Sequence, residues 1–239
     1  MTKPADRIFV ALDTTNVDEA RAMAQRLKGT VGGVKLGLEF FTANGAAGVR
    51  AVTGSGLPLF LDLKFHDIPN TVAGAIRAAI SLRPKIVNVH AAGGPAMMRA
   101  AAEAATEAAK AQKAPRPMVI AVTVLTSLDA GDLEAVGQIG PAADQVLRLA
   151  RLTRDCGLDG IVCSPKEVAS VRAACGPGFK LVVPGIRPNL SLSNDQKRTA
   201  GPADAVGAGA DILVIGRPIT RAPDPAAAAR AMAATLAAG

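Results

Sequence analysis

The chain has 239 residues, with 27 lysines and arginines against 20 aspartates and glutamates, 49% hydrophobic residues, and neither tryptophan nor tyrosine. This apolar fraction is large enough for a sizeable core and excludes a disordered chain. The net charge of +7 comes from scattered basic residues, and only six phenylalanines could stack on bases. Nucleic acid is therefore not the expected partner.

No apolar run approaches the ~20 residues that a bilayer crossing requires, so we expect no membrane span. The first residues contain no apolar leader segment, which favours a cytoplasmic location. The three cysteines, Cys156, Cys163 and Cys175, are odd in number and form no C-x-x-C pair. They predict neither a disulfide framework nor a zinc site.

Short apolar runs alternate with alanine-rich helical patterns along the whole chain. The predicted strands cover residues 8–12, 33–36, 59–63, 86–89, 118–122, 160–162, 181–183 and 212–215. Helical patterns between them include residues 17–27, 71–82, 97–109, 142–154, 165–174 and 226–236. The strands are continuously apolar, as in a parallel sheet that is buried on both faces. About eight β-then-α cycles predict a single α/β domain over residues 1–239, a (β/α)₈ TIM barrel.

A doubly wound open sheet is the alternative fold. That fold usually carries a glycine fingerprint after its first strand, whereas the first strand here runs into Leu12-Asp13-Thr14-Thr15. Two long connections, residues 123–141 and 184–202, both follow strands. In a barrel they would lie on the C-terminal face, where long loops commonly act as lids.

Familiar catalytic motifs are absent. The sequence contains no G-x-G-x-x-G after a strand, no P-loop, no H-E-x-x-H and no G-x-S-x-G. His66 and His90 are the only histidines, so an all-histidine metal site is excluded. No metal or cofactor is expected.

Polar and charged residues instead occur at the ends of the predicted strands. Strands buried in a barrel should carry few charges, so a series of them on one rim indicates an active site. His66 and His90 are interpreted as packing or hydrogen-bonded rim residues, and Asn88 fits either this rim or an amide in a core layer. The rim residues, in chain order, are Asp13, Lys35, Asp62, Lys64, Asn88, His90 and Arg217.

The densest cluster is residues 61–71. Asp62 and Lys64 are two residues apart on a strand, so their side chains should point to the same side. A lysine flanked by carboxylates stays protonated, which suits a proton donor to a carbanion better than a Schiff-base nucleophile. With Lys35 and Asp67 added, the sequence predicts an alternating array of two lysines and two aspartates whose titrations are coupled.

An anion site is predicted at the other end of the chain. Gly216-Arg217 follows the eighth strand and opens a helix, and Gly185-Ile186-Arg187 follows the seventh. Glycine lets backbone N–H groups approach an anion, and arginine offers a bidentate fork. Because barrels frequently bind phosphate after strands 7 and 8, these turns favour a phosphorylated substrate.

These motifs resemble those of the bacterial type of orotidine 5′-phosphate decarboxylase, over nearly the whole chain. The most specific segment is DLKFHDIPNT at residues 62–71. Supporting segments are ALD at 11–13, VKLG at 34–37, LTS at 125–127, PGIRP at 184–188, DQ at 195–196 and IGRPIT at 215–220. The D-x-K-x-x-D element alone also occurs in relatives of different activity, whereas the full set is specific.

The resemblance implies cofactor-free and metal-free decarboxylation of orotidine 5′-monophosphate to UMP, the last step of de novo UMP synthesis. By this resemblance Lys64 protonates the carbanion at C6, Asp62 lies beside the departing carboxylate, and Lys35 and Asp67 hold the array and touch ribose hydroxyls. It also implies a homodimer in which Asp67 and Thr71 reach the neighbouring subunit's site. The remaining implied substrate contacts are Asp13 for the ribose, Thr126 and Ser127 for the base, and Arg187, Gln196, Gly216 and Arg217 for the phosphate.

Three alternatives remain open at this point. Mg²⁺-dependent sugar-phosphate decarboxylases and aldolases of the same barrel superfamily share D-x-K-x-x-D but place a carboxylate where this chain has Lys35, and a lysine there would repel the cation. A Schiff-base aldolase would use Lys64 as its nucleophile. A basic barrel that only binds anions or nucleic acid leaves the charges at the strand ends unexplained.

Overall fold

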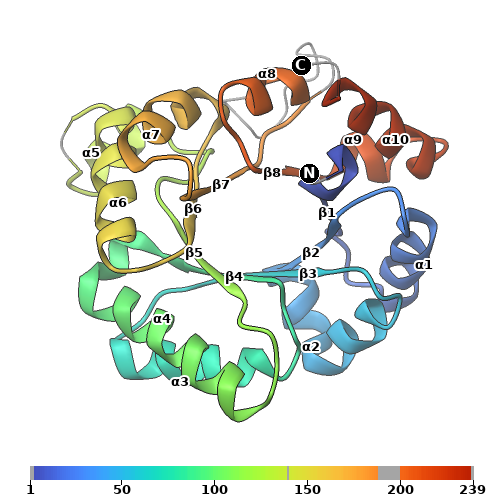
Figure 1. Ribbon diagram of the computed structural model, residues 1–239, viewed down its shortest axis with the longest axis horizontal. Coiled ribbons are helices and arrows are strands. Elements are labelled where there is room, and N and C mark those ends of the chain that lie inside the picture. The colour runs from blue at the N-terminus through green and yellow to red at the C-terminus, as the bar shows by residue number, and fades with distance from the viewer. Residues whose placement is uncertain (1–2, 139, 188–199, 238–239) are drawn as a thin grey trace.

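The eight apolar runs form eight parallel strands that pair in chain order, and β8 pairs with β1 to close the barrel. This computed structural model describes residues 3–138, 140–187 and 200–237. Helices surround the strands on all sides (Figure 1), which confirms the predicted (β/α)₈ barrel. The strands are β1 (Ile8–Ala11), β2 (Gly33–Gly37), β3 (Leu59–Phe65), β4 (Ile86–His90), β5 (Met118–Val122), β6 (Gly160–Val162), β7 (Lys180–Val183) and β8 (Ile212–Ile215).

Most helices occur where the helical patterns predict them. One predicted helix, residues 165–174, is instead a 3₁₀ turn, Pro165–Glu167, followed by a shorter α-helix. Another helix, α2, was not among the predicted patterns, and its Gly45 has a φ of 57° at a kink. The helices are α1 (Val17–Leu27), α2 (Leu38–Thr53), α3 (Pro69–Ile80), α4 (Gly94–Ala111), α5 (Ala130–Ala135), α6 (Ala142–Asp155), α7 (Val168–Cys175), α8 (Pro202–Gly207), α9 (Arg217–Thr220) and α10 (Pro225–Thr235).

Two apolar cores result from the alternation of side chains along each strand. The larger core fills the space between the strands and the helices. The smaller one fills the inside of the barrel with Phe9, Phe60, Ile86, Ile120 and Val182, among others. Each of these large side chains is almost fully buried, which contributes ~1.5–3 kcal/mol relative to exposure.

Gly33 makes room for this inner core. A Cβ at that position would lie 2.4 Å from the Phe9 ring, so any larger residue would displace the ring. The inner core therefore fills the interior of the barrel below the carboxyl ends of the strands. At those ends, other side chains line the barrel.

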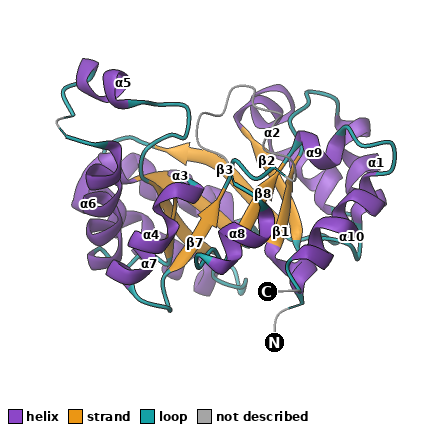
Figure 2. Cartoon of the chain, turned by 90° about the horizontal axis from the view of Figure 1, so that it is seen from above, coloured by secondary structure: helices purple, strands orange, loops and turns teal. Residues whose placement is uncertain are grey.

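The long connection after β5 contains the short helix α5, which stands apart from the barrel wall (Figure 2). None of the three cysteines lies in a disulfide. Burial raises the pKa of the Cys156 and Cys175 thiols. Among the described residues, no helix combines the length and apolar character needed to cross a bilayer.

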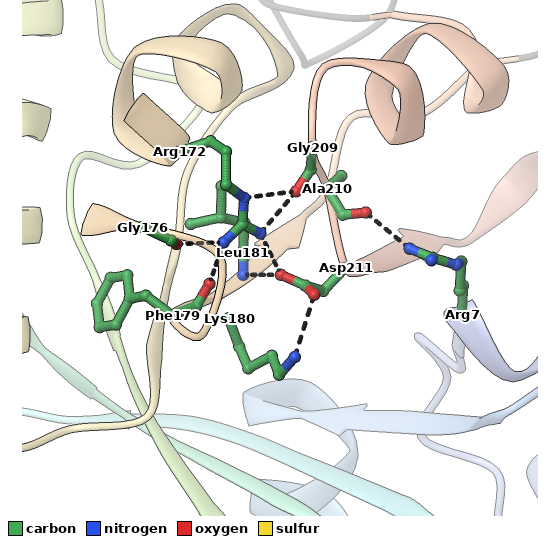
Figure 3. Close-up of polar contacts among 9 residues, drawn as sticks. All are labelled: Arg7, Arg172, Gly176, Phe179, Lys180, Leu181, Gly209, Ala210 and Asp211. Atoms are coloured by element: carbon green, nitrogen blue, oxygen red, sulfur yellow. Dashed lines mark hydrogen bonds and ion pairs between the residues drawn. The ribbon is translucent and has the colours of Figure 1, made fainter. Parts of the chain in front are cut away.

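The amino ends of β7 and β8 are joined by a cluster of polar contacts around Arg172 and Asp211 (Figure 3). Arg172, on α7, donates to the carbonyl oxygens of Gly176, Phe179 and Gly209 and forms an ion pair with Asp211. The Asp211 carboxylate also accepts the N–H of Leu181 on β7, at 2.9 Å. The cluster thus ties the two strands that carry the predicted phosphate turns.

A similar contact joins β5 and β6. Asp159 directly precedes β6, accepts the N–H of Val119 on β5 at 2.7 Å, and pairs with Arg116 at 2.8 Å. In both cases an aspartate before an even-numbered strand uses a backbone N–H at the start of the preceding strand. These contacts stabilise the face opposite to the carboxyl ends of the strands.

We expect Arg172→Ala to lower the free energy of unfolding by about 2–3 kcal/mol, because the carbonyl oxygens of Gly176, Phe179 and Gly209 lose their charged donor and Asp211 keeps only the longer ion pair with Lys180, at 3.3 Å. Chemical denaturation measures this change. Arg154→Ala is the control, because the Arg154–Asp155 ion pair is exposed, and it should cost less than about 1 kcal/mol. Equal effects of the two variants would contradict the assignment.

Candidate active site

A polar layer lies directly above the inner apolar core, toward the carboxyl ends of the strands. Side chains two residues apart on a strand point to the same side. Lys35 therefore follows Gly33 into the barrel, Asp62 follows Phe60, and Asn88 follows Ile86. Asp62 and Asn88 are buried.

The strand β3 departs from regular geometry where this layer begins. Leu61 pairs with Val87 and Phe65 pairs with Val89, so three residues of β3 lie opposite one residue of β4. Within this bulge Lys64 has a φ of 51°, the left-handed region that costs a non-glycine residue about 1–2 kcal/mol. The sequence predicted that Asp62 and Lys64 point to the same side because they are two residues apart on a regular strand. The strand is irregular here, so this reason is wrong, although the two side chains do contact each other.

Asp62 is the centre of a network of charges. Its Oδ1 lies 2.7 Å from the Lys64 Nζ, and its Oδ2 lies 3.2 Å from the Lys35 Nζ. Lys35 also lies 3.4 Å from Asp13, whose side chain is 61% exposed. Two ammonium groups and two carboxylates thus alternate across the mouth of the barrel.

These contacts set the charge states of the buried groups. Burial would raise the pKa of the Asp62 carboxyl, but Lys35, Lys64 and the Asn88 amide together lower it. Burial would lower the pKa of Lys35, but Asp62 and then Asp13 together raise it. The stabilisation from Asp62 is therefore lost only as the pH falls through its lowered pKa, and that from Lys35 only as the pH rises through its raised pKa. Asp62 and Lys35 therefore both keep their charges across the neutral range.

The charged network lines a cavity of about 240 Å³ at the carboxyl ends of the strands. On its other side the cavity is lined by the two Gly-Arg turns, with Gly185, Arg187, Gly216 and Arg217. Gly185 has a φ of 78°, which lets the chain turn sharply after β7. The next residue, Ile186, forms a parallel bridge with Ala200, which fixes both ends of the segment between them.

The structure brings most of the predicted site residues to this one cavity. The predicted residues that line it are Asp13, Lys35, Asp62, Lys64, Thr126, Arg187, Gly216 and Arg217. Ser127 is exposed and is not among the residues that line this cavity in the described part of the chain. Gln196 lies outside the described residues.

Asp67 and Thr71 are both exposed and do not line this cavity of the described chain. Asp67 accepts the N–H of Ile68 at 2.6 Å, and Thr71 lies in the first turn of α3. The array of four charges is therefore present within one chain only as Lys35, Asp62 and Lys64, with Asp13 in place of Asp67.

Several apolar residues of the cavity were not predicted. Phe60, Val122, Val162 and Val214 form much of its wall. Val122 and Val162 are the last residues of their strands, so the same rule that selected the polar rim residues would have found them. These four side chains place apolar surface in the same cavity as the charges.

No three histidine, cysteine, aspartate or glutamate side chains of the described residues lie together as metal ligands would. The two oxygens of Asp62 already face ammonium groups of this chain. A divalent cation at Asp62 would have to displace one of these lysines.

Comparison with known proteins shows the family of this chain. Residues 6–232 match the family model described as the orotidine 5′-phosphate decarboxylase / HUMPS family. The chain belongs to this family. The orotidine 5′-phosphate decarboxylase of Paramagnetospirillum magneticum is 60% identical over 96% of this chain and 97% of its own, and that of Sphingopyxis alaskensis is 56% identical over 99% and 100%. The crystal structure of orotidine 5′-phosphate decarboxylase from Lactobacillus acidophilus superposes with a TM-score of 0.85 at 36% identity, covering 96% of this chain and 98% of that one.

The charge network of this family member makes a measurable prediction. We expect Asp62→Asn to lower the pKa of Lys35, because burial then acts against only the more distant carboxylate of Asp13. NMR titration of the lysine side-chain nitrogen measures the shift. The control Asp13→Asn should lower this pKa less, and a larger effect of Asp13→Asn than of Asp62→Asn would contradict the assignment.

Proposed function

We propose that this protein decarboxylates orotidine 5′-monophosphate to UMP and CO₂ without a metal or cofactor, as the last step of de novo UMP synthesis. The observation that carries the proposal is the buried Lys35–Asp62–Lys64 network, which shares one cavity with two Gly-Arg turns. The names of the curated relatives, at 54–60% identity in the first cases, support the same reaction.

In this proposal one side of the cavity binds the phosphate, and the other side holds the reacting end of the substrate. Arg187, Gly216 and Arg217 bind the phosphate, together with Gln196. Asp13 and Lys35 bind ribose hydroxyls, and Thr126 with Ser127 binds the base. The pyrimidine ring lies against the apolar wall, with its C6 carboxylate directed at Asp62 and Lys64.

The chemical step breaks the bond between C6 and the carboxylate carbon. The electron pair stays on C6 as CO₂ leaves, and the Lys64 ammonium then gives its proton to C6. Lys64 regains a proton from solvent after the product leaves. A fixed ammonium beside the developing carbanion stabilises it in a site that is already organised before the substrate binds. The negative charge of Asp62 next to the substrate carboxylate favours loss of that carboxylate.

Binding of the remote phosphate supplies energy that organises the reacting end. The loops after β5 and β7 are the natural segments to close over the substrate. Removing the phosphate from the substrate should therefore reduce catalysis and not only affinity.

The proposed assembly is a homodimer in which Asp67 and Thr71 complete the partner's site. Both residues are exposed at the start of α3, on the same rim as the cavity. Exposed Ile68 and Leu38 on this rim offer apolar surface for such an interface. The single domain over residues 1–239, the cytoplasmic location and the absence of a nucleic-acid partner remain part of this proposal.

The Mg²⁺-dependent sugar-phosphate enzymes are the competing function, and the matched family description covers a wider group than the decarboxylases alone. The position of the Lys35 ammonium group argues against this function. Its ammonium lies 3.2 Å from Asp62, where such an enzyme would need a carboxylate and a cation.

The test is loss of the ultraviolet absorbance of orotidine 5′-monophosphate with the purified protein in excess EDTA, with UMP and CO₂ identified as products. We expect rapid turnover, and Lys64→Ala should reduce it by roughly 10⁴-fold or more because the proton donor and a fixed charge are both lost. Binding of UMP, measured by calorimetry, should remain. Lys110→Ala, on the outer face of α4, is the control and should turn over normally.

Absence of turnover by folded wild-type protein would contradict the proposed reaction. The sample would then be tested with Mg²⁺ and sugar phosphates. Near-normal turnover by Lys64→Ala would remove the proton-donor role alone.

The shared site predicts rescue between two inactive variants. In a 1:1 mixture of Lys64→Ala and Asp67→Asn with random exchange of subunits, half of the dimers are hybrids and each has one intact site. About a quarter of the wild-type activity should therefore return. Native mass spectrometry measures the exchange, and full exchange without recovery of activity would exclude a site shared through Asp67.

A further inference from the structure

Asn88 contacts both the backbone and the partner of the proposed proton donor. It lies on β4, fully buried, opposite the bulge of β3. Its Oδ1 accepts the N–H of Lys64 at 2.8 Å, and its Nδ2 donates to the Asp62 Oδ1 at 2.7 Å. The same Asp62 oxygen accepts from the Lys64 Nζ at 2.7 Å, so the three residues form a closed ring of contacts.

The two contacts determine how the amide is oriented. The opposite orientation would place the amide oxygen against the Asp62 carboxylate and the amide NH₂ against the Lys64 N–H. Both of these pairs are repulsive. An uncharged side chain with one donor and one acceptor therefore suits this position, and a carboxylate or a hydrocarbon does not.

The bulge explains why Lys64 needs this support. Regular pairing with β4 is interrupted between Leu61 and Phe65, and Lys64 has a φ of 51° there. The Asn88 side chain supplies the acceptor for its backbone N–H in place of a strand carbonyl. The backbone conformation of Lys64 in turn determines where its ammonium group lies.

We propose that Asn88 is a positioning residue for proton transfer: it holds the Lys64 backbone in the bulge and fixes the Asp62 carboxylate that holds the Lys64 ammonium. This inference rests on the proposed function. Asn88 is not among the residues that line the cavity, so in the described chain it acts through Lys64 and Asp62 and not on the substrate directly.

The experiment measures kcat, KM, UMP affinity and melting temperature of Asn88→Ala against wild-type protein. We expect kcat to fall roughly 100-fold, because misplacement of a reacting group by about 1 Å costs about that much. KM and UMP affinity should change less than about threefold, since no substrate contact is removed. Thr153→Val is the matched control: it removes another fully buried polar group, on α6, and should leave kcat unchanged.

A second variant, Asn88→Asp, keeps the volume and tests the two contacts themselves. When protonated, the introduced carboxyl can donate to Asp62 and accept from Lys64 as the amide does. When ionised, it can only accept, and it faces the Asp62 carboxylate. We therefore expect the ratio of its kcat to that of wild-type protein to rise by about tenfold or more as the pH is lowered from about 8 to about 5.

The groups that bear on this titration are few. Asp62 and Lys64 face position 88 from β3, Lys35 pairs with the same Asp62 from β2, and His90 follows on β4. The register partner on β5 is the apolar Ile120. Burial, then His66 and Lys64, lower the pKa of His90, against a smaller opposite effect of Asp62, and the wild-type protein measured at each pH corrects for the titration of His90.

A kcat of Asn88→Ala within about threefold of wild type would overturn the proposal, as would a pH-independent ratio for Asn88→Asp. Equal losses of kcat and UMP affinity in both variants would also overturn it, because they would indicate a general structural role. If Asn88→Ala does not fold, the Asn88→Asp profile decides. Wild-type turnover in the same assay separates failure of this inference from failure of the proposed function.

Discussion

The buried carboxylate of Asp62 is the constraint on which the rest of the site depends. A carboxylate at this depth is costly unless opposite charges and hydrogen-bond donors surround it. Lys35, Lys64 and Asn88 meet that need from three adjacent strands. The same contacts hold the ammonium groups of Lys35 and Lys64 beside Asp62 at the wall of the cavity. Removing Asp62 would leave the two lysines to repel each other in a place that water reaches poorly.

The barrel provides this arrangement through its geometry. Inward positions repeat every second residue, so a layer of large apolar side chains is followed by a layer of polar ones at the carboxyl ends. β2, β3 and β4 contribute the charged residues and their amide, whereas β7 and β8 lead into the two Gly-Arg turns. The charged network and the two Gly-Arg turns therefore lie on opposite sides of one cavity. Separate strands hold them, which in the proposed function lets phosphate binding at one side be coupled to decarboxylation at the other.

The sequence was sufficient to predict the fold, because continuous apolar strands and alternating helices leave few topologies. Lys35, Asp62, Lys64 and the Gly-Arg turns were also within reach, since charges at strand ends stand out against apolar neighbours. The bulge at Lys64 was not, because residues 62–64 contain no glycine and the left-handed backbone is associated with Asn88 on another strand. The helix α2 was missed because its glycines weaken the helical pattern. The proposed roles of Asp67 and Thr71 depend on a second chain, which no pattern within one chain can reveal.

The strain at Lys64 and the compensation by Asn88 are best understood together. A lysine on a regular strand would project its ammonium along the row of inward side chains, directly above Phe60 and Asp62. The bulge adds two extra residues to β3 and lets Asp62 and Lys64 contact each other while both remain at the cavity. Such strain persists only where surrounding contacts determine the conformation. The Asn88 side chain, fixed by two hydrogen bonds and full burial, provides those contacts at the one residue of β4 that faces the bulge. The bulge of β3 and the buried Asn88 amide on β4 thus depend on each other, and each would destabilise the fold without the other.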